Sequence, residues 1–239
     1  MAGHKIGNYF FYAIGEILLV MIGILLALQV NNWNEARKST QQEIKILREL
    51  NNDLKTNYKE VEESHTTTTN RYNSTILILN YFDQNKPVDD DLKKAFELIR
   101  SDGIFNISNT SYKFIENQGI NVMSNDNLRI RITEMYERHL KNIRTREDRN
   151  WDLVNEELIP HMINHFKSSP TVDPDASFAG ENLNMPRDIT SLRNNDTFRN
   201  IIIRLQDILI MRLNWQGEAK RSLGQLITDV NDEIVRLDK

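Results

Sequence analysis

The sequence lacks cysteine entirely, which excludes disulfide bonds, thiolate catalysis and cysteine-based zinc sites. It is also poor in glycine and proline, with 9 and 5 residues among 239, and this scarcity favours helices. A basic surplus is missing too, because 34 Asp and Glu outnumber 30 Lys and Arg. Nucleic acid is therefore not an expected partner, since nothing in the charge balance would displace counterions from its phosphates. With 27% charged and 39% hydrophobic residues, the chain otherwise has the composition of one folded domain.

One long hydrophobic run stands near the N-terminus, from Phe10 to Val30, and Glu16 is its only ionisable side chain. As a helix this run spans about 31 Å, which matches the hydrocarbon core of one bilayer. We therefore expect a transmembrane helix at residues 10–30, after a short tail at residues 1–9 and before an extramembrane domain at residues 31–239. The lipid bilayer is the first expected partner.

Aromatic side chains flank the run, with Tyr9 and Tyr12 at one end and Trp33 at the other. Amphipathic rings prefer the headgroup level, so these three residues are expected at the membrane interface. A secretory signal peptide is the alternative interpretation, because Lys5 precedes an apolar segment. Signal peptides usually have a shorter apolar region, and residues 27–29 form a poor cleavage site, so the length of the run favours an uncleaved anchor.

Within the run, small residues recur at steps of four and leave one helix face thin enough for a second helix to approach closely. This small face comprises Gly15, Leu19, Gly23 and Ala27. Glu16 lies beside it, and a carboxyl group at membrane depth usually faces protein or water. One hypothesis is that the chain forms a homo-oligomer by packing Gly15, Glu16, Gly23 and Ala27 against a second copy. The other is that Glu16, about two turns from the aromatic end, reaches the interface or stays protonated.

Basic residues on the two sides of the anchor give one indication of its orientation. Only Lys5 precedes the run, whereas Arg37, Lys38, Lys45 and Arg48 follow it, mixed with acidic residues. Because cytoplasmic flanks carry the excess of Lys and Arg, this count by itself favours a cytoplasmic domain.

Two segments resemble a known protein family. The first is YAIGEILLVMIGILLALQVNNWNEARK at residues 12–38, and the second is SYKFIENQGINVMSNDNLRIRITEMYE at residues 111–137. In the second segment the family pattern falls on Tyr112, Gly119, Leu128 and Arg129. Both segments are similar to an uncharacterised family of single-pass inner-membrane proteins of the Bacteroidota, which has no established activity. The resemblance implies an inside N-terminus and a periplasmic domain, and we expect this placement in the bacterial inner membrane.

Residues 44–82 carry the alternating spacing of three and four that is typical of a long helix with a coiled-coil seam. The seam residues are Ile44, Leu47, Asn51, Leu54, Tyr58, Val61, His65, Thr68, Tyr72, Thr75, Leu79 and Phe82. The seam is polar and β-branched at residues 65–69, so packing should weaken there. Two interpretations stay open for this stretch: a polar pocket inside a bundle, or a solvated irregular segment.

Further helices are predicted at residues 89–100, 108–118, 126–166 and 196–237, with an irregular excursion at residues 168–195. The predicted fold is therefore all-α, with one N-terminal transmembrane helix that continues into a bundle of three long and two short helices.

Four details of these helices can be tested against a structure. Asp126 is expected to cap the 126–166 helix, and Pro160 should kink or interrupt it. Trp151 and Trp215 are expected on the apolar stripes of the last two long helices.

Glu157, His161 and His165 follow one another at steps of four and form a weak candidate for a metal site. A zincin motif would need glutamate where Met162 stands, so a solvated or capping role is the competing interpretation. The segment from Asp173 to Ser177 begins like a calcium loop, but its sixth position is not glycine. We expect no metal and no cofactor.

Nothing in the sequence points to catalysis, because no serine lies in a nucleophile motif with a matching base. We expect a non-enzymatic protein, and two hypotheses remain. The first is a scaffold or interaction protein of the cell envelope that self-associates and binds another envelope membrane protein. The second is a ligand-sensing bundle in the periplasm that acts through a membrane partner. The few residues before the anchor favour the first hypothesis, since sensing needs an output on the other side of the bilayer.

Overall fold

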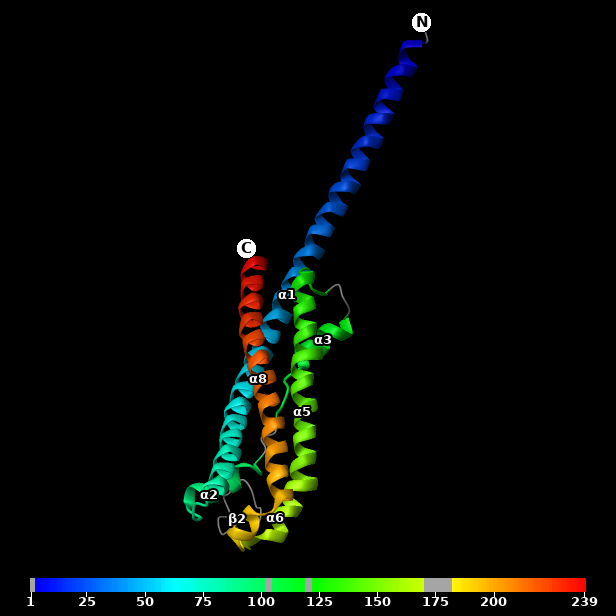
Figure 1. Cartoon of the computed structure of the whole chain (residues 1–239). Coiled ribbons are helices and arrows are strands. Elements are labelled where there is room, and N and C mark those ends of the chain that lie inside the picture. The colour runs from blue at the N-terminus through cyan, green and yellow to red at the C-terminus, as the bar shows by residue number, and fades with distance from the viewer. Residues whose placement is uncertain (1–2, 102–104, 119–121, 170–181) are drawn as a thin grey trace.

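The computed structural model describes residues 3–101, 105–118, 122–169 and 182–239. Side chains are described for residues 14–101, 105–118, 122–167 and 183–239. Within these ranges the chain is helical apart from one small hairpin, which confirms the predicted all-α class. Figure 1 shows an elongated bundle from which one helix projects far beyond the others.

Three long helical stretches and several short elements make up the described chain. The elements are α1 (Gly3–Asp83), α2 (Asp90–Leu98), α3 (Thr110–Gln118), α4 (Asp126–Glu134), η2 (Met135–Leu140), α5 (Lys141–Asp152), η3 (Leu153–Leu158), α6 (Ile159–His165), β1 (Phe166–Ser169), β2 (Asn182–Pro186), α7 (Ile189–Arg193) and α8 (Asp196–Leu237). The described ranges hold three short helices, α2, α3 and α7, where two were predicted.

Helix α1 runs without interruption from the apolar N-terminal run into the bundle, as predicted. It ends at Asp83, one residue after the last predicted seam residue, and Asn85 just beyond takes a positive φ of 53°. The second half of α1 packs along the whole of α8, which runs back so that its C-terminal end lies beside α1 (Figure 1). Elements α2, α6 and β2 close the opposite, distal end of the bundle (Figure 1).

One row of the predicted seam on α1 is buried along its length, and the other row is buried only near its start. Residues repeating every seven from Leu47 through Leu54 and Val61 to Phe82 are at most 5% exposed. In the second predicted row, Ile44 and Asn51 are buried, whereas the later members are only half-buried, namely Tyr58, His65, Tyr72 and Leu79. A neighbouring row is buried in its place, namely Leu50, Asn57, Arg71 and Ile78. Because Asn57 and Arg71 are polar, the spacing of apolar residues did not predict this row.

The middle stretch, α4 to α6, is continuous, but two segments of π-helix interrupt its α-helical hydrogen bonding. The predicted cap was wrong by one residue, because the side chain of Asn125, and not Asp126, accepts from the amide of Leu128. Pro160 does not end the helical stretch. The hydrogen-bond pattern changes in η3, and α6 begins at Ile159. Proline has no amide hydrogen to donate, and the change of hydrogen-bond pattern in η3 falls where its bond would be missing.

The expected irregular excursion at residues 168–195 was wrong for part of its length. Strands β1 and β2 pair antiparallel, with Phe166 opposite Pro186 and Lys167 opposite Met185. Helix α7 follows, and its amides at Thr190 and Ser191 are capped by Asp188. The calcium-like residues Asp173, Asp175 and Ser177 lie outside the described residues.

Two expected core tryptophans lie nearer the surface than predicted. Trp151 is 59% exposed, and the neighbouring Asn150 is buried in its place. Trp215 is half-buried with the guanidinium of Arg146 4.8 Å from its ring, while Gln216 points inward. Both errors are shifts of one residue around the helix, made by assigning the inner position to the larger aromatic side chain.

Candidate functional site

The described apolar part of α1 has nothing packed on it. From residue 14 to residue 30 every side chain is exposed, including a continuous series of leucine, isoleucine and valine residues. In a folded chain such an uncovered series marks a surface that meets lipid or another protein. This segment belongs to a helix that lies near the N-terminus and is long and apolar enough to cross a membrane.

The small face within this segment is open as well. A methyl group added at Gly15 or Gly23 would meet nothing within 4 Å. Glu16 and Ala27 are exposed beside these glycines. The face is therefore free to take a second helix at close range.

Of the residues expected at the membrane interface, the structure describes the side chain of Trp33. Its indole is 65% exposed, and the guanidinium of Arg37 lies 5.7 Å from the ring centre. The side chains of Tyr9 and Tyr12 lie outside the described ones. Trp33 and Arg37 thus present an aromatic ring and a cation together, just past the apolar segment.

A polar layer crosses the bundle between two apolar clusters. On α1 the apolar core stops at Val61 and resumes at Ile78, and α8 shows the same gap between Leu209 and Ala219. On α5 and η3 it falls between Ile143 and Leu153. The buried polar residues in these gaps are Thr68, Arg71, Ser74, Thr75, Asn150, Arg212 and Gln216.

Contacts inside the polar layer join the three long stretches. The Arg212 guanidinium on α8 pairs with Glu147 on α5 at 3.3 Å, and both side chains are largely buried. Gln216 donates from Nε2 to the hydroxyls of Ser64 and Thr68 on α1, at 2.9 and 3.2 Å. This layer overlaps the polar middle of the predicted seam, where α1 is a regular helix. Within residues 65–69, Thr68 is buried and Thr66 is exposed, so this stretch is partly solvated.

Arg71 extends the layer toward the loop after α2. Its side chain is fully buried and donates to the carbonyl oxygen of Ile99 at 3.0 Å. Sequence reasoning missed Arg71, Arg212 and Asn150, although their spacing relative to the apolar stripes placed them on the inner faces. A charged residue at an inner position of a long helix is the signal that would have found them.

The family-pattern segment around Tyr112 packs near Asp53 and Asn57 of α1. The Asp53 carboxylate accepts from the hydroxyl of Ser108 at 2.6 Å and from the amide of Ser111 at 2.9 Å, so α1 caps the start of α3. The Asn57 side chain exchanges two hydrogen bonds with the backbone of Ser108. These contacts seat the Ser-Tyr turn of the pattern against α1.

Tyr112 stacks on Tyr136, with ring centres 4.4 Å apart and an angle of 5° between the ring planes. Burial raises the pKa of both phenols, with Glu137 adding to the effect at Tyr112 and Asp53 at Tyr136. Leu128 is buried in the core, whereas Arg129 is at the surface and pairs with Asp126. Gly119 lies outside the described residues. The described residues of this pattern serve packing and capping.

The histidine and glutamate residues of the candidate metal site do not converge. The rings of His161 and His165 stack at 4.5 Å, but Glu157 pairs with Arg204 on α8 at 2.5 Å. Burial lowers the pKa of His161, and His165 lowers it further. Within the described residues, no group of three histidine, aspartate or glutamate residues is arranged to hold a metal ion.

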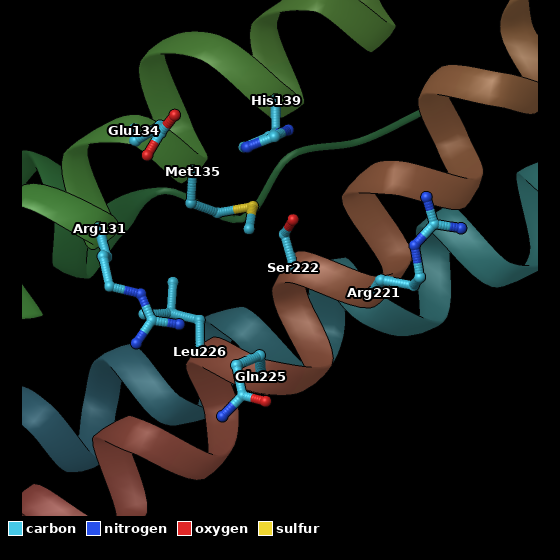
Figure 2. A pocket seen from close by; sticks show the side chains of 8 residues that line it. All are labelled: Arg131, Glu134, Met135, His139, Arg221, Ser222, Gln225 and Leu226. Atoms are coloured by element: carbon cyan, nitrogen blue, oxygen red, sulfur yellow. The ribbon is translucent and has the colours of Figure 1, made fainter.

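A shallow hollow of about 280 Å³ lies between η2 and α8 (Figure 2). Arg131, Glu134 and His139 line one side, and Arg221 and Gln225 line the other. Most of its charges already have partners: Arg131 pairs with Asp229, Glu134 with Arg138, and His139 lies 3.8 Å from Glu218. The hollow is therefore close to neutral and selects for no particular ligand charge.

These features define an all-α protein with one long helix that is apolar enough to span a membrane and that continues as the spine of a bundle. The model of a family of unknown function, DUF6090, matches residues 16–159, from the apolar run through η3. Because this match covers more than half of the chain, the protein belongs to that family. It confirms the predicted resemblance to a family without known activity. Comparison with curated proteins and with solved structures gives no match.

Proposed function

We propose that the protein is a membrane-anchored interaction or scaffold protein of the bacterial cell envelope, without catalytic activity, that self-associates through its anchor. The observation that carries the proposal is the unbroken course of α1 from an uncovered apolar segment into the bundle core. A helix of this kind fixes the bundle at a set distance from the bilayer. The bundle surface is then the part that meets another envelope protein.

Self-association is supported by the open small face. Without a hydrophobic driving force inside lipid, helices associate where small residues allow close packing and where a polar group finds a partner. Gly15 and Gly23 supply the first condition and Glu16 the second. A homo-oligomer would place two Glu16 carboxyl groups where one, if protonated, donates to the other.

We place the bundle in the periplasm and the anchor in the inner membrane, following the family resemblance and against the count of basic residues. A cysteine introduced at the exposed position Lys55 provides the test, because the native chain has no cysteine to interfere. A membrane-impermeant maleimide should label it in intact cells whose outer membrane has been permeabilised. Labelling only after lysis would place the bundle in the cytoplasm.

The anchor itself is tested by extraction at alkaline pH and by flotation with vesicles. We expect the full chain to remain with the membrane fraction under both conditions. Release at alkaline pH, or a mature chain that begins after Gln29, would contradict the proposal.

Self-association is tested by oxidative crosslinking in native membranes. Leu19→Cys lies on the small face, and Met21→Cys, about half a turn away, is the matched control. We expect a crosslinked dimer for Leu19→Cys and little or none for Met21→Cys. Adding Glu16→Leu should weaken the crosslink. Equal crosslinking at both positions would remove the small face from the proposal, and an unchanged yield with Glu16→Leu would remove Glu16.

The polar layer supports a second candidate function, a ligand-sensing bundle that acts through a membrane partner. A small polar molecule bound at this level would alter the packing of α1 against α8, and α1 leads directly to the membrane. Native mass spectrometry of the chain released from membranes separates the two functions. An envelope protein that copurifies supports the scaffold, whereas a monomer with a retained metabolite supports the sensor.

A further inference from the structure

A second hollow lies at the end of the bundle that faces the anchor. It occupies about 410 Å³ between the start of the extramembrane part of α1 and the C-terminal end of α8. Trp33, Arg37, Gln41 and Ile44 line it from α1, and Leu237 and Lys239 line it from the other side. Figure 1 shows the end of α8 beside α1 at this level, with the apolar part of α1 continuing beyond it.

The position of this hollow follows from the rise of α1. Trp33 and Arg37 lie about 5 and about 10 Å along the helix axis from Val30, the last residue of the apolar run. The headgroup layer on each side of a bilayer is roughly 5 to 8 Å thick. Trp33 therefore lies within the headgroup layer, and Arg37 lies just outside it, where its side chain can reach back to a phosphate. Ile44, about 21 Å from Val30, lies well beyond the headgroups.

The charges around the hollow favour a phosphate. Arg37 and Lys239 have no carboxylate partner among the residues that the structure describes, whereas the nearby Lys38 is paired with Glu35. Asp238, the acidic residue of the lining, pairs with Arg48 at 3.4 Å. Two cations thus face the hollow, and the guanidinium of Arg37 lies over the exposed ring of Trp33.

We propose that this hollow binds the headgroup phosphate of an anionic phospholipid from the bilayer that holds the anchor. Arg37 presents a planar fork of donors that suits phosphate oxygens, and Lys239 adds a second cation on a flexible stem. Trp33, which lies nearer the hydrocarbon core than Arg37, provides an apolar ring for the glycerol end of the lipid. This inference rests on the proposed membrane anchoring.

The test uses the full chain in vesicles, with Trp33 as the only tryptophan after Trp151→Phe and Trp215→Phe. Vesicles of phosphatidylcholine contain a fixed fraction of either brominated phosphatidylglycerol or brominated phosphatidylcholine, whose bromines quench a neighbouring indole. We expect the brominated anionic lipid to quench Trp33 as if its local concentration were roughly fivefold higher per cation in contact. Arg37→Gln with Lys239→Gln should abolish this preference.

The matched control is Arg144→Gln with Lys55→Gln, which removes the same two charges from exposed positions away from the hollow. This control should keep the preference of the parent. Equal quenching by the two lipids, or a preference that survives Arg37→Gln with Lys239→Gln, would overturn the lipid site while leaving the anchor intact. Quenching by neither lipid, together with failure to float with the vesicles, would instead overturn the proposed anchoring.

Discussion

At the scale of single residues, the hydrogen bonds that matter most join elements far apart in the chain. Asp53 on α1 caps α3, and Glu43 on α1 accepts from the amide and hydroxyl of Ser124 just before α4. Glu233 on α8 accepts from Asn125, the cap of α4. Each carboxylate satisfies donors at a helix start that would otherwise lack acceptors.

Replacing Asp53 by alanine should lower the free energy of unfolding by about 1 to 2 kcal/mol, because the amide of Ser111 and the hydroxyl of Ser108 lose their acceptor. Urea unfolding of the full chain in detergent, followed by circular dichroism, measures this change. Asp148→Ala is the control, since Asp148 is exposed on α5, and it should change stability by less than about 0.5 kcal/mol. Equal effects would show that Asp53 is not a cap.

The stability of the bundle should fall as the pH falls below about 6.5, in part because of His161. Burial and His165 lower the pKa of His161 in the folded protein, so below about pH 6.5 the unfolded chain binds a proton that the folded chain does not. The contribution is present above that pH and is lost below it. Urea midpoints at about pH 7.5 and about pH 5.5 should therefore differ less for His161→Phe than for the parent. Identical differences would contradict this role.

Which residues face inward could be predicted only where they are apolar. Leu47, Leu54 and Val61 were assigned correctly from their spacing, because an apolar side chain at a repeating position has a strong reason to be buried. Arg71 was missed because it is charged, and the carbonyl that makes its burial tolerable belongs to Ile99, in the loop after α2. Asn150 was missed because it is polar.

At the scale of elements, the polar layer has a role in alignment. A leucine stripe can slide by a turn along another leucine stripe at small cost, whereas a buried ion pair or amide pairs in one register only. The contacts of Arg212 with Glu147 and of Gln216 with Thr68 fix α8 against α5 and against α1. The layer thus fixes the register of α8 against α1 and α5, and with it the packing of the two apolar clusters on either side.

Glu147→Gln should destabilise the bundle by about 2 to 3 kcal/mol, because it removes a carboxylate from a buried guanidinium. Glu134→Gln is the matched control: its pair with Arg138 is exposed, and the change should stay below about 0.5 kcal/mol. The double variant Glu147→Leu with Arg212→Met should regain most of the lost stability. Urea unfolding measures all three, and a neutral Glu147→Gln would contradict a structural role for the pair.

The long elements were largely predictable, and the small ones were not. The end of α1 and both ends of α8 were predicted to within one residue from the extent of the apolar spacing, which is local in sequence. The pairing of β1 with β2 was missed because its strands are separated by residues 170–181 and no short hairpin turn joins them. The π-helical segments were missed because their residue spacing does not differ from that of an α-helix.

At the scale of the whole molecule, the small face and the hollow beside α8 lie on the same side of α1. Eighteen residues make five turns of an α-helix, so Gly15 lies in line with Trp33, Leu19 with Arg37, and Gly23 with Gln41. The end of α8 occupies this side just beyond the apolar run. Two copies that pack through their small faces must therefore diverge before they reach the bundles.

Crosslinking should accordingly stop at the membrane surface. In native membranes we expect Leu19→Cys to form a dimer readily, and Gln41→Cys to form it at least about tenfold more slowly, although both lie on one side of the helix. The crosslinking rates are measured as the loss of the uncrosslinked monomer band over time on non-reducing gels. Comparable rates would mean that the copies run parallel beyond the membrane.

The unbroken length of α1 also determines how far the protein reaches. From Val30 to Asp83 the helix rises up to about 80 Å, so in the proposed anchored state the tip formed by α2, α6 and the hairpin would stand well clear of the lipid surface. A short neighbour in the same membrane meets only the flank of the bundle. A partner that binds this tip must itself extend far from the membrane, or must be attached to a second envelope layer that faces it.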